Sequence, residues 1–304
     1  MGTSRWSASD WDSYASSTKT KTTDAIFKSH SLKDELNPLN IGVRESRDSD
    51  LNPQSNAIIV GLDVTGSMGI IADSLAREGL GTLVEEILSR KPVQDPHIMF
   101  MGIGDAYYDS APLQVTQFEA DITIAKTLED LYLEHGGGGN SFESYNLPWY
   151  FAANHTSIDC FEKRGKKGYL FTVGDEEAPK ELLASHVKKI IGDTPQQDYS
   201  TEQLLTMVSR MYHVFHVVVE EGHHAKYHLN EVMNSWTKLL GQRVLRLSNY
   251  KNLSEVIVSA IQITEGSDID TVTKSWSGNT SLVVGKAVNG LAKRDSSAGE
   301  LVRF

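Results

Sequence analysis

The feature that most constrains the fold is a regular alternation of short apolar runs and amphipathic helical patterns between residues 55 and 265. The run from Ala57 to Leu62 carries no polar side chain, which is typical of a strand buried on both faces of a parallel sheet. Apolar residues from Leu80 to Leu88 then recur at helical spacing. The same reasoning predicts further strands at 97–103, 113–118, 168–173, 214–219 and 244–247, and further helices at 122–133, 142–153, 180–191, 201–211, 224–240 and 253–263.

Strands that alternate with helices indicate an α/β fold, with an open and mostly parallel sheet covered by helices on both faces. The segment 113–118 follows 97–103 closely enough to form a hairpin with it. In sheets of this kind, ligands bind beyond the carboxyl ends of the central strands. Asp63 and Asp175 each follow a predicted strand, so we expect both acids at that edge.

Three zones of the chain differ in composition. Residues 1–54 form a polar arm rich in Ser and Thr, which is predicted to be extended or disordered because it can bury little surface. Its aromatic residues, among them Trp6 and Trp11, could instead anchor it to a groove on its own domain or on a partner. Residues 55–265 form the α/β domain. Residues 266–304 form a C-terminal tail, in which 281–291 could be one docking helix.

The chain has 304 residues and a formal net charge of -11, which disfavours nucleic acid and favours cations or basic protein surfaces. The single cysteine, Cys160, excludes an intrachain disulfide and a Cys-based zinc site, and it fits a reducing compartment. Residues 1–30 contain no secretory hydrophobic segment, and no apolar run approaches the ~20 residues that span a bilayer. We therefore expect a cytoplasmic protein that does not contact membranes, with its oligomeric state left open.

The strongest local signal is the segment Asp63-Val64-Thr65-Gly66-Ser67-Met68-Gly69. It places a carboxylate and two hydroxyls at positions i, i+2 and i+4, in a tight turn between a buried strand and a helix. Alternate side chains of such a turn point to one centre. Ligands that are all oxygen suit a hard ion such as Mg²⁺ or Mn²⁺ rather than zinc. The alternative is a strand-end Asp with neighbouring hydroxyls that cap the helix.

Two further loops carry polar residues. Four consecutive glycines at 136–139 precede Asn140 and Ser141, and they would let the backbone approach a ligand closely. No Lys follows them, so a phosphate-binding loop is not supported, and a flexible connection is the alternative. Asp175 follows the predicted strand 168–173, where it could be a metal ligand or could cap the next helix.

Together, these elements resemble the metal-ion-dependent adhesion site of the von Willebrand factor A family, over about residues 56–265. The family's first motif is Asp-x-Ser-x-Ser. This sequence has Asp63, Thr65 and Ser67 at those positions, and the Thr keeps the hydroxyl.

The other two motifs of the family match less closely. The second supplies a Thr after a glycine-rich turn, where this sequence has Asn140 with Ser141 beside it and Glu143 as a further contributor. The third is an Asp after the fourth strand, matched by Asp175. The resemblance implies a Rossmann-like sheet and one Mg²⁺ or Mn²⁺ held by Asp63, Thr65, Ser67, Asn140 and Asp175.

The resemblance also implies a function. In this family the metal keeps one coordination position open for an Asp or Glu of a protein partner, and intracellular members often act as adaptors for AAA-type ATPases or other assemblies. We therefore expect a cation-dependent protein-binding module and not an enzyme. Two alternatives stay open: a metal-dependent phosphoesterase or other hydrolase, and a structural protein whose metal stiffens the loops. The hydrolase is disfavoured because no His or further acid is evidently placed as a general base.

Overall fold

The computed structural model describes residues 4–134 and 142–291, except for the side chain of Ser67. Its centre is a six-stranded sheet in the order β10-β9-β6-β2-β3-β4. Neighbouring strands are parallel, except that β4 runs antiparallel to β3. The sheet therefore confirms the predicted α/β class, and the hairpin at its edge was predicted too. The strands are β2 (Asn56–Asp63), β3 (Pro96–Ile103), β4 (Leu113–Val115), β6 (Gly168–Gly174), β9 (Tyr212–Val219) and β10 (Val244–Leu247).

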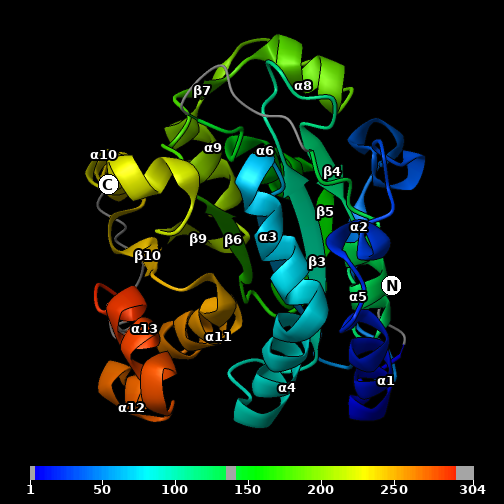
Figure 1. Cartoon of the computed structure of the whole chain (residues 1–304). Coiled ribbons are helices and arrows are strands. Elements are labelled where there is room, and N and C mark those ends of the chain that lie inside the picture. The colour runs from blue at the N-terminus through cyan, green and yellow to red at the C-terminus, as the bar shows by residue number, and fades with distance from the viewer. Residues whose placement is uncertain (1–3, 135–141, 292–304) are drawn as a thin grey trace.

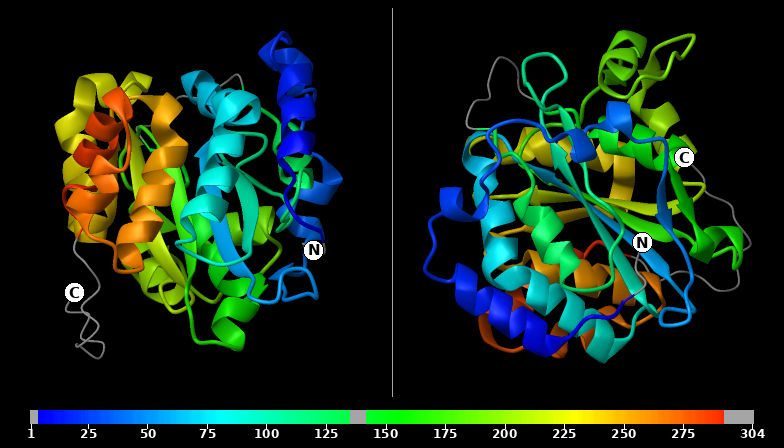
Figure 2. Two further views of the ribbon diagram at one scale, coloured as in Figure 1. Left: turned by 90° about the horizontal axis from the view of Figure 1, so that it is seen from below. Right: turned by 90° about the vertical axis from the view of Figure 1, so that its right-hand side faces the viewer.

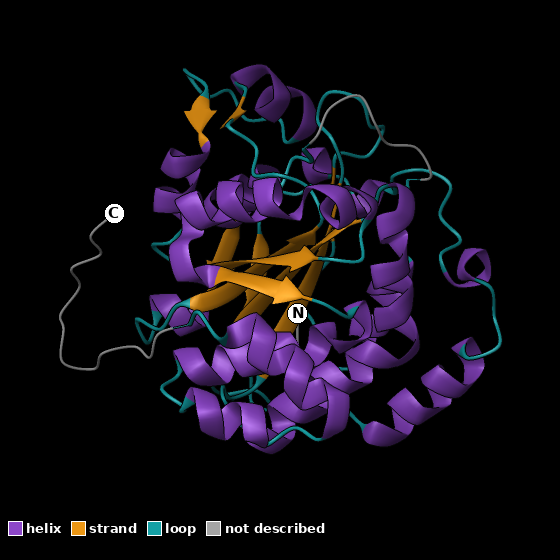
Figure 3. Ribbon diagram, turned by 60° about the vertical axis from the view of Figure 1, so that its left-hand side comes forward, coloured by secondary structure: helices purple, strands orange, loops and turns teal. Residues whose placement is uncertain are grey.

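Helices cover both faces of the sheet, so the molecule has three layers (Figure 3). Strand β2 shows why: Ile58 and Val60 belong to one hydrophobic core, whereas Ala57 and Ile59 belong to the other. All eight residues of β2 are buried, as expected for a central strand. The first core is closed by α3 (Gly69–Ser74), the π-helical turn η4 (Leu75–Gly79), α4 (Leu80–Arg90), α5 (Thr123–Glu129) and α11 (Leu253–Thr264). The second is closed by α6 (Asn146–Asn154), α9 (Thr201–Val208) and α10 (His223–Leu240).

The described part of the N-terminal arm is folded onto the domain, so the expectation of an extended or disordered segment is corrected. Helix α1 (Ala8–Thr18) lies beside α4 and η4 (Figure 1). The Trp11 side chain is 7% exposed and lies against Gly81, where a Cβ atom would come within 2.1 Å of the indole nitrogen. The alternative anchoring of the aromatic residues in a groove of their own domain is therefore what the structure contains. The arm continues through α2 (Thr23–Ile26), η1 (Asp34–Leu36), η2 (Pro38–Asn40) and β1 (Arg44–Ser46).

The end of the arm is also held by polar contacts. Strand β1 pairs in parallel with β5 (Thr156–Ile158), away from the main sheet. The buried Arg44 donates to the carbonyl of Val115, 3.0 Å away, and Arg47 donates to Asp159 at 2.9 Å. Burial lowers the pKa of Arg44 to about 10. These contacts tie the arm to strand β4 and to α7 (Asp159–Glu162). The boundary after residue 54 remains a prediction for limited proteolysis.

The structure adds a small cap at 181–200 and a pair of C-terminal helices to the predicted elements. Residues 180–191 were predicted as one helix, but the segment begins with strand β7 (Glu181–Leu182), which pairs with β8 (Tyr199–Ser200) around α8 (Ala184–Ile190). This cap stands at the top of Figure 1. In the C-terminal tail, α12 (Ile269–Lys274) and α13 (Gly278–Val288) pack against α11, and the left view of Figure 2 shows these orange and red helices together at one side of the molecule. In the described segments, no helix combines the length and the apolar character needed to cross a membrane.

Helix α6 begins later than predicted, and it accommodates Pro148. The helix starts at Asn146, so Pro148 lies in its first turn, where the missing N–H has no intrahelical partner to lose. The residues before it, 142–145, are therefore not helical and belong to the loop that reaches the candidate site.

A buried histidine at the start of β3 gives a test of the fold. The ring of His97 is fully buried, its Nδ1 lies 3.1 Å from Ser46 Oγ, and its Nε2 has no hydrogen-bond partner among the described residues. Burial lowers the pKa of His97 to about 4. The unfolded chain therefore takes up a proton on this ring at higher pH than the folded chain does, so its contribution to stability is complete above pH ~6.5 and is lost as the pH falls toward 4.

Between pH 6.5 and 4, we expect the free energy of unfolding of the wild type to fall by about 3 kcal/mol more than that of His97→Asn. Only the wild type carries the imidazole whose pKa is lowered in the folded state. Urea unfolding of both proteins across that pH range measures the difference. His30→Asn is the control, since His30 is exposed. Parallel pH profiles for the wild type and His97→Asn would contradict this account.

Candidate cation site at the carboxyl edge of the sheet

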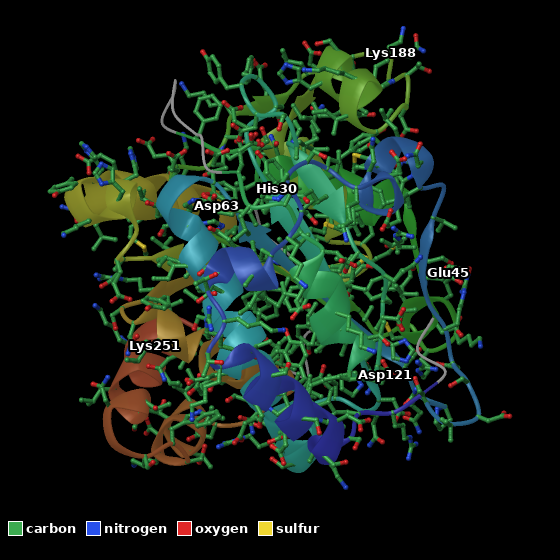
Figure 4. All side chains as sticks on the ribbon, turned by 45° about the vertical axis from the view of Figure 1, so that its right-hand side comes forward. His30, Glu45, Asp63, Asp121, Lys188 and Lys251 are labelled. Atoms are coloured by element: carbon green, nitrogen blue, oxygen red, sulfur yellow. The ribbon has the colours of Figure 1, made fainter. Side chains whose placement is uncertain are left out.

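The site begins where β2 ends, at a turn that the local sequence defines. Asp63 is 1% exposed, and its Oδ1 accepts hydrogen bonds from the Thr65 backbone N–H at 3.0 Å and from the Thr65 hydroxyl at 2.7 Å. Gly66 follows with φ 42°, a conformation that favours glycine, and starts the short helix η3 (Gly66–Met68) before α3. The turn therefore holds the Thr65 hydroxyl against Asp63. Figure 4 places Asp63 near the start of α3, in the same half of the molecule as the cap that carries Lys188.

The second oxygen of Asp63 is held by a residue that the sequence did not indicate. The Tyr145 hydroxyl donates to Asp63 Oδ2 at 2.9 Å, and the tyrosine is fully buried. Gly174, the last residue of β6, makes room for it, because a Cβ atom there would lie 2.0 Å from the Tyr145 hydroxyl oxygen. Burial and then the charge of Asp63 raise the pKa of Tyr145 well above its usual value, so it acts as a donor.

Glu143 faces the same turn from the loop before α6. Its side chain is 4% exposed, and its Oε1 lies 3.3 Å from the Thr65 hydroxyl oxygen. Burial, followed by the charge of Asp63, raises the pKa of Glu143 to about 10. Burial also raises the pKa of Asp63 to about 7, with Asp175 adding to the rise and hydrogen bonds from Thr65 opposing it. Without a cation, this is a place where negative charge is unfavourable.

Asp175 lies at the amino end of α10. Its Oδ2 accepts a hydrogen bond from the His224 backbone N–H at 2.7 Å, so one oxygen caps a helix. That helix follows β9, and is not the next helix along the chain. Gly222 allows the approach, because a Cβ atom there would lie 2.3 Å from Asp175 Cβ. Burial raises the pKa of Asp175, and its charge is close enough to Asp63 to raise the pKa of that acid as well.

Further acids and exposed aromatic rings surround this centre. The charges of Asp105, Asp109 and Glu176 all help to raise the pKa of Glu143. Burial, followed by Asp63 and Asp175, raises the pKa of Glu176 to about 8. In the same β3–β4 loop, the side chains of Tyr107 and Tyr108 are 48% and 62% exposed. The Tyr107 ring packs edge-on against His186 of α8, with centroids 4.4 Å apart, and thereby joins this loop to the cap.

The structure places some of the predicted ligands and leaves others outside the described residues. It brings Asp63 and Thr65 into contact, with the charge of Asp175 close by. Asn140 and the side chain of Ser67 lie outside the described residues. Two more residues, Glu143 and Tyr145, contact this turn. The sequence suggested Glu143 only as a further contributor to the site, and it gave no indication of Tyr145, which lies two residues later. Which of the five predicted residues bind a cation stays a prediction.

The described residues fit a hard cation better than a soft one. No three His, Cys, Asp or Glu side chains within 4–134 and 142–291 are arranged to hold a metal ion together. The groups that gather at the turn are instead carboxylate oxygens and a hydroxyl, which suit Mg²⁺ or Mn²⁺. A cation there would also offset the charges that raise the pKa of Asp63 and of Glu143.

No protein-family model matches this sequence, and neither does any curated protein. Among solved structures, the chain is similar to the pilus adhesin SpaC from Lactobacillus rhamnosus GG (10% identity, 74% of this chain and 32% of that one, TM-score 0.46). It is also similar to proximal thread matrix protein 1 from the mussel byssus (11%, 69% and 47%, TM-score 0.42) and to a von Willebrand factor type A protein from Catenulispora acidiphila (14%, 71% and 44%, TM-score 0.35). The chain thus spans less than half the length of each of these structures.

Proposed function

We propose that this chain is a protein-binding module that holds one Mg²⁺ or Mn²⁺ at the carboxyl edge of its sheet and is not an enzyme. The observation that carries the proposal is the Thr65 hydroxyl, which Asp63 holds at 2.7 Å while the Glu143 carboxylate faces it at 3.3 Å. The resemblance of the sequence to the metal-ion-dependent adhesion site supports the interpretation of this arrangement as a cation site that binds a protein partner. In that scheme an Asp or Glu of the partner takes the open position on the cation.

The acidic residues around the site disfavour a partner whose surface is acidic throughout. Asp105, Asp109 and Glu176 would repel an acidic surface even when one divalent cation is bound. A partner acid that reaches the cation therefore needs Lys or Arg beside it to offset the negative charge of this region. The exposed rings of Tyr107 and Tyr108 offer the apolar contact area that a single ion–carboxylate contact cannot supply.

The proposal extends to the setting of the protein. We infer an intracellular adaptor, for example of an AAA-type ATPase or of another assembly, that binds neither nucleic acid nor membrane. The net charge of -11 and the single cysteine support this setting. Identification of the captured proteins from the native host would test it.

The direct test is capture of host proteins by the immobilised chain, in Mg²⁺ and again in EDTA, beside a turnover screen on phosphate esters with Mn²⁺. We expect a partner that is retained in Mg²⁺, released by EDTA and recovered when Mg²⁺ is restored, without turnover of the esters. Retention that ignores EDTA would favour the structural alternative. Cation-dependent turnover would favour the hydrolase.

A further inference from the structure

The carboxylate of Glu143 is buried with one oxygen left unused. Oε1 faces the Thr65 hydroxyl, but Oε2 has no hydrogen-bond partner among the described residues, and the side chain is 4% exposed. A buried polar oxygen without a partner is costly, and a buried carboxylate more so. A cation beside Glu143 would give this oxygen a partner and would stabilise the ionised carboxylate that burial disfavours.

Asp63 is less free to bind a cation directly. Its Oδ1 accepts two hydrogen bonds from Thr65, and its Oδ2 accepts one from Tyr145. Three of its four acceptor positions are therefore used, and only one, on Oδ2, is left for an ion. Asp63 orients the Thr65 hydroxyl, which lies closer to Asp63 Oδ1, at 2.7 Å, than to Glu143 Oε1, at 3.3 Å.

The distance between the Thr65 hydroxyl oxygen and Glu143 Oε1 suits a divalent ion. Thr65 has one hydroxyl hydrogen, so its contact with Glu143 at 3.3 Å brings together an oxygen lone pair and a carboxylate oxygen once that hydrogen is given to Asp63. Neighbouring ligands of an octahedral ion with bonds of about 2.1 Å lie about 3 Å apart. An ion between the Thr65 hydroxyl oxygen and Glu143 Oε1 could therefore bond to both.

We propose that Glu143 is the carboxylate that binds the cation directly, beside the Thr65 hydroxyl, while Asp63 acts behind it as a positioning residue. The inference rests on the proposed cation-dependent function and assigns its central ligand. It also gives this chain a charged ligand close to the position where the family's second motif has a neutral Thr.

The test is calorimetric titration of the full chain with Mn²⁺, comparing the wild type with Glu143→Gln. We expect Glu143→Gln to weaken Mn²⁺ binding by about 100-fold or more, because the amide loses the charge of a direct ligand. The matched control is Glu181→Gln, since Glu181 is exposed on β7, and its affinity should stay within about twofold of the wild type. Circular dichroism and thermal unfolding in EDTA check that Glu143→Gln folds. It should melt no lower than the wild type, because burial opposes ionisation of the Glu143 carboxyl and the amide cannot ionise.

A crystal grown with Mn²⁺ separates direct from indirect binding. Its anomalous density should lie within bonding distance, about 2.1 Å, of a Glu143 oxygen and of the Thr65 hydroxyl. Density bonded to Asp63 and not to Glu143, or unchanged Mn²⁺ affinity in Glu143→Gln, would overturn the inference and leave the proposed function standing. If the wild type binds no Mn²⁺, the proposed function itself falls.

Discussion

Asp63→Ala is expected to weaken Mg²⁺ or Mn²⁺ binding by more than about 100-fold and to abolish cation-dependent partner capture. The change removes a charge beside the cation and also the acceptor that holds both the N–H and the hydroxyl of Thr65. It further leaves the fully buried Tyr145 hydroxyl without its acceptor. Calorimetry and capture in one Mg²⁺ buffer measure both effects.

Asp63→Asn separates the charge from the geometry at the same position. Its amide oxygen can still accept from Thr65, whereas its charge is gone, so the cation site should weaken while the turn persists. In EDTA this variant should unfold at the same urea concentration as the wild type or higher, because burial opposes ionisation of Asp63. Added Mg²⁺ should stabilise only the wild type. Asp50→Ala, on the exposed end of the arm, is the control. Equal capture by wild type and Asp63→Ala would remove the cation from the function.

Trp11→Ala is expected to lower the free energy of unfolding by about 3 kcal/mol or more, the usual cost of truncating a buried Trp. The indole is packed directly against Gly81 of α4, and its ring also lies tilted against the rings of Trp6 and Tyr14 of the arm. Without it, α1 loses a buried contact with the domain. Urea unfolding measures the loss in stability, and limited proteolysis should then cut within the arm.

Two controls sharpen this prediction. Trp11→Phe keeps a ring in the groove and should recover part of the stability. Leu39→Ala removes an apolar side chain from the same arm at a position that is 52% exposed, and should change the stability by no more than about 0.5 kcal/mol. If Trp11→Ala unfolds like the wild type and resists protease equally, the arm does not depend on this contact.

The sequence alone determined the parts of the protein that depend on local patterns. An apolar run such as 57–62 can be satisfied only by burial on both faces, so the parallel sheet followed from it. The turn at Asp63 and Thr65 was predictable because it too is local. Its contacts join residues two apart, and a strand end followed by a helix start leaves few ways to arrange them.

Only the tertiary structure decided what meets that turn. Glu143 contacts Thr65 across 78 residues, Tyr145 reaches Asp63 across 82, and Asp175 caps a helix 49 residues further on. The arm is a similar case, since the contact of Trp11 with Gly81 depends on a groove built by other elements. None of these contacts leaves a periodic signal, because loop residues follow no helical or strand spacing. The order of the strands in the sheet decides which loops meet. Loops that are far apart along the chain therefore come together, and their separation in the sequence does not predict the contact.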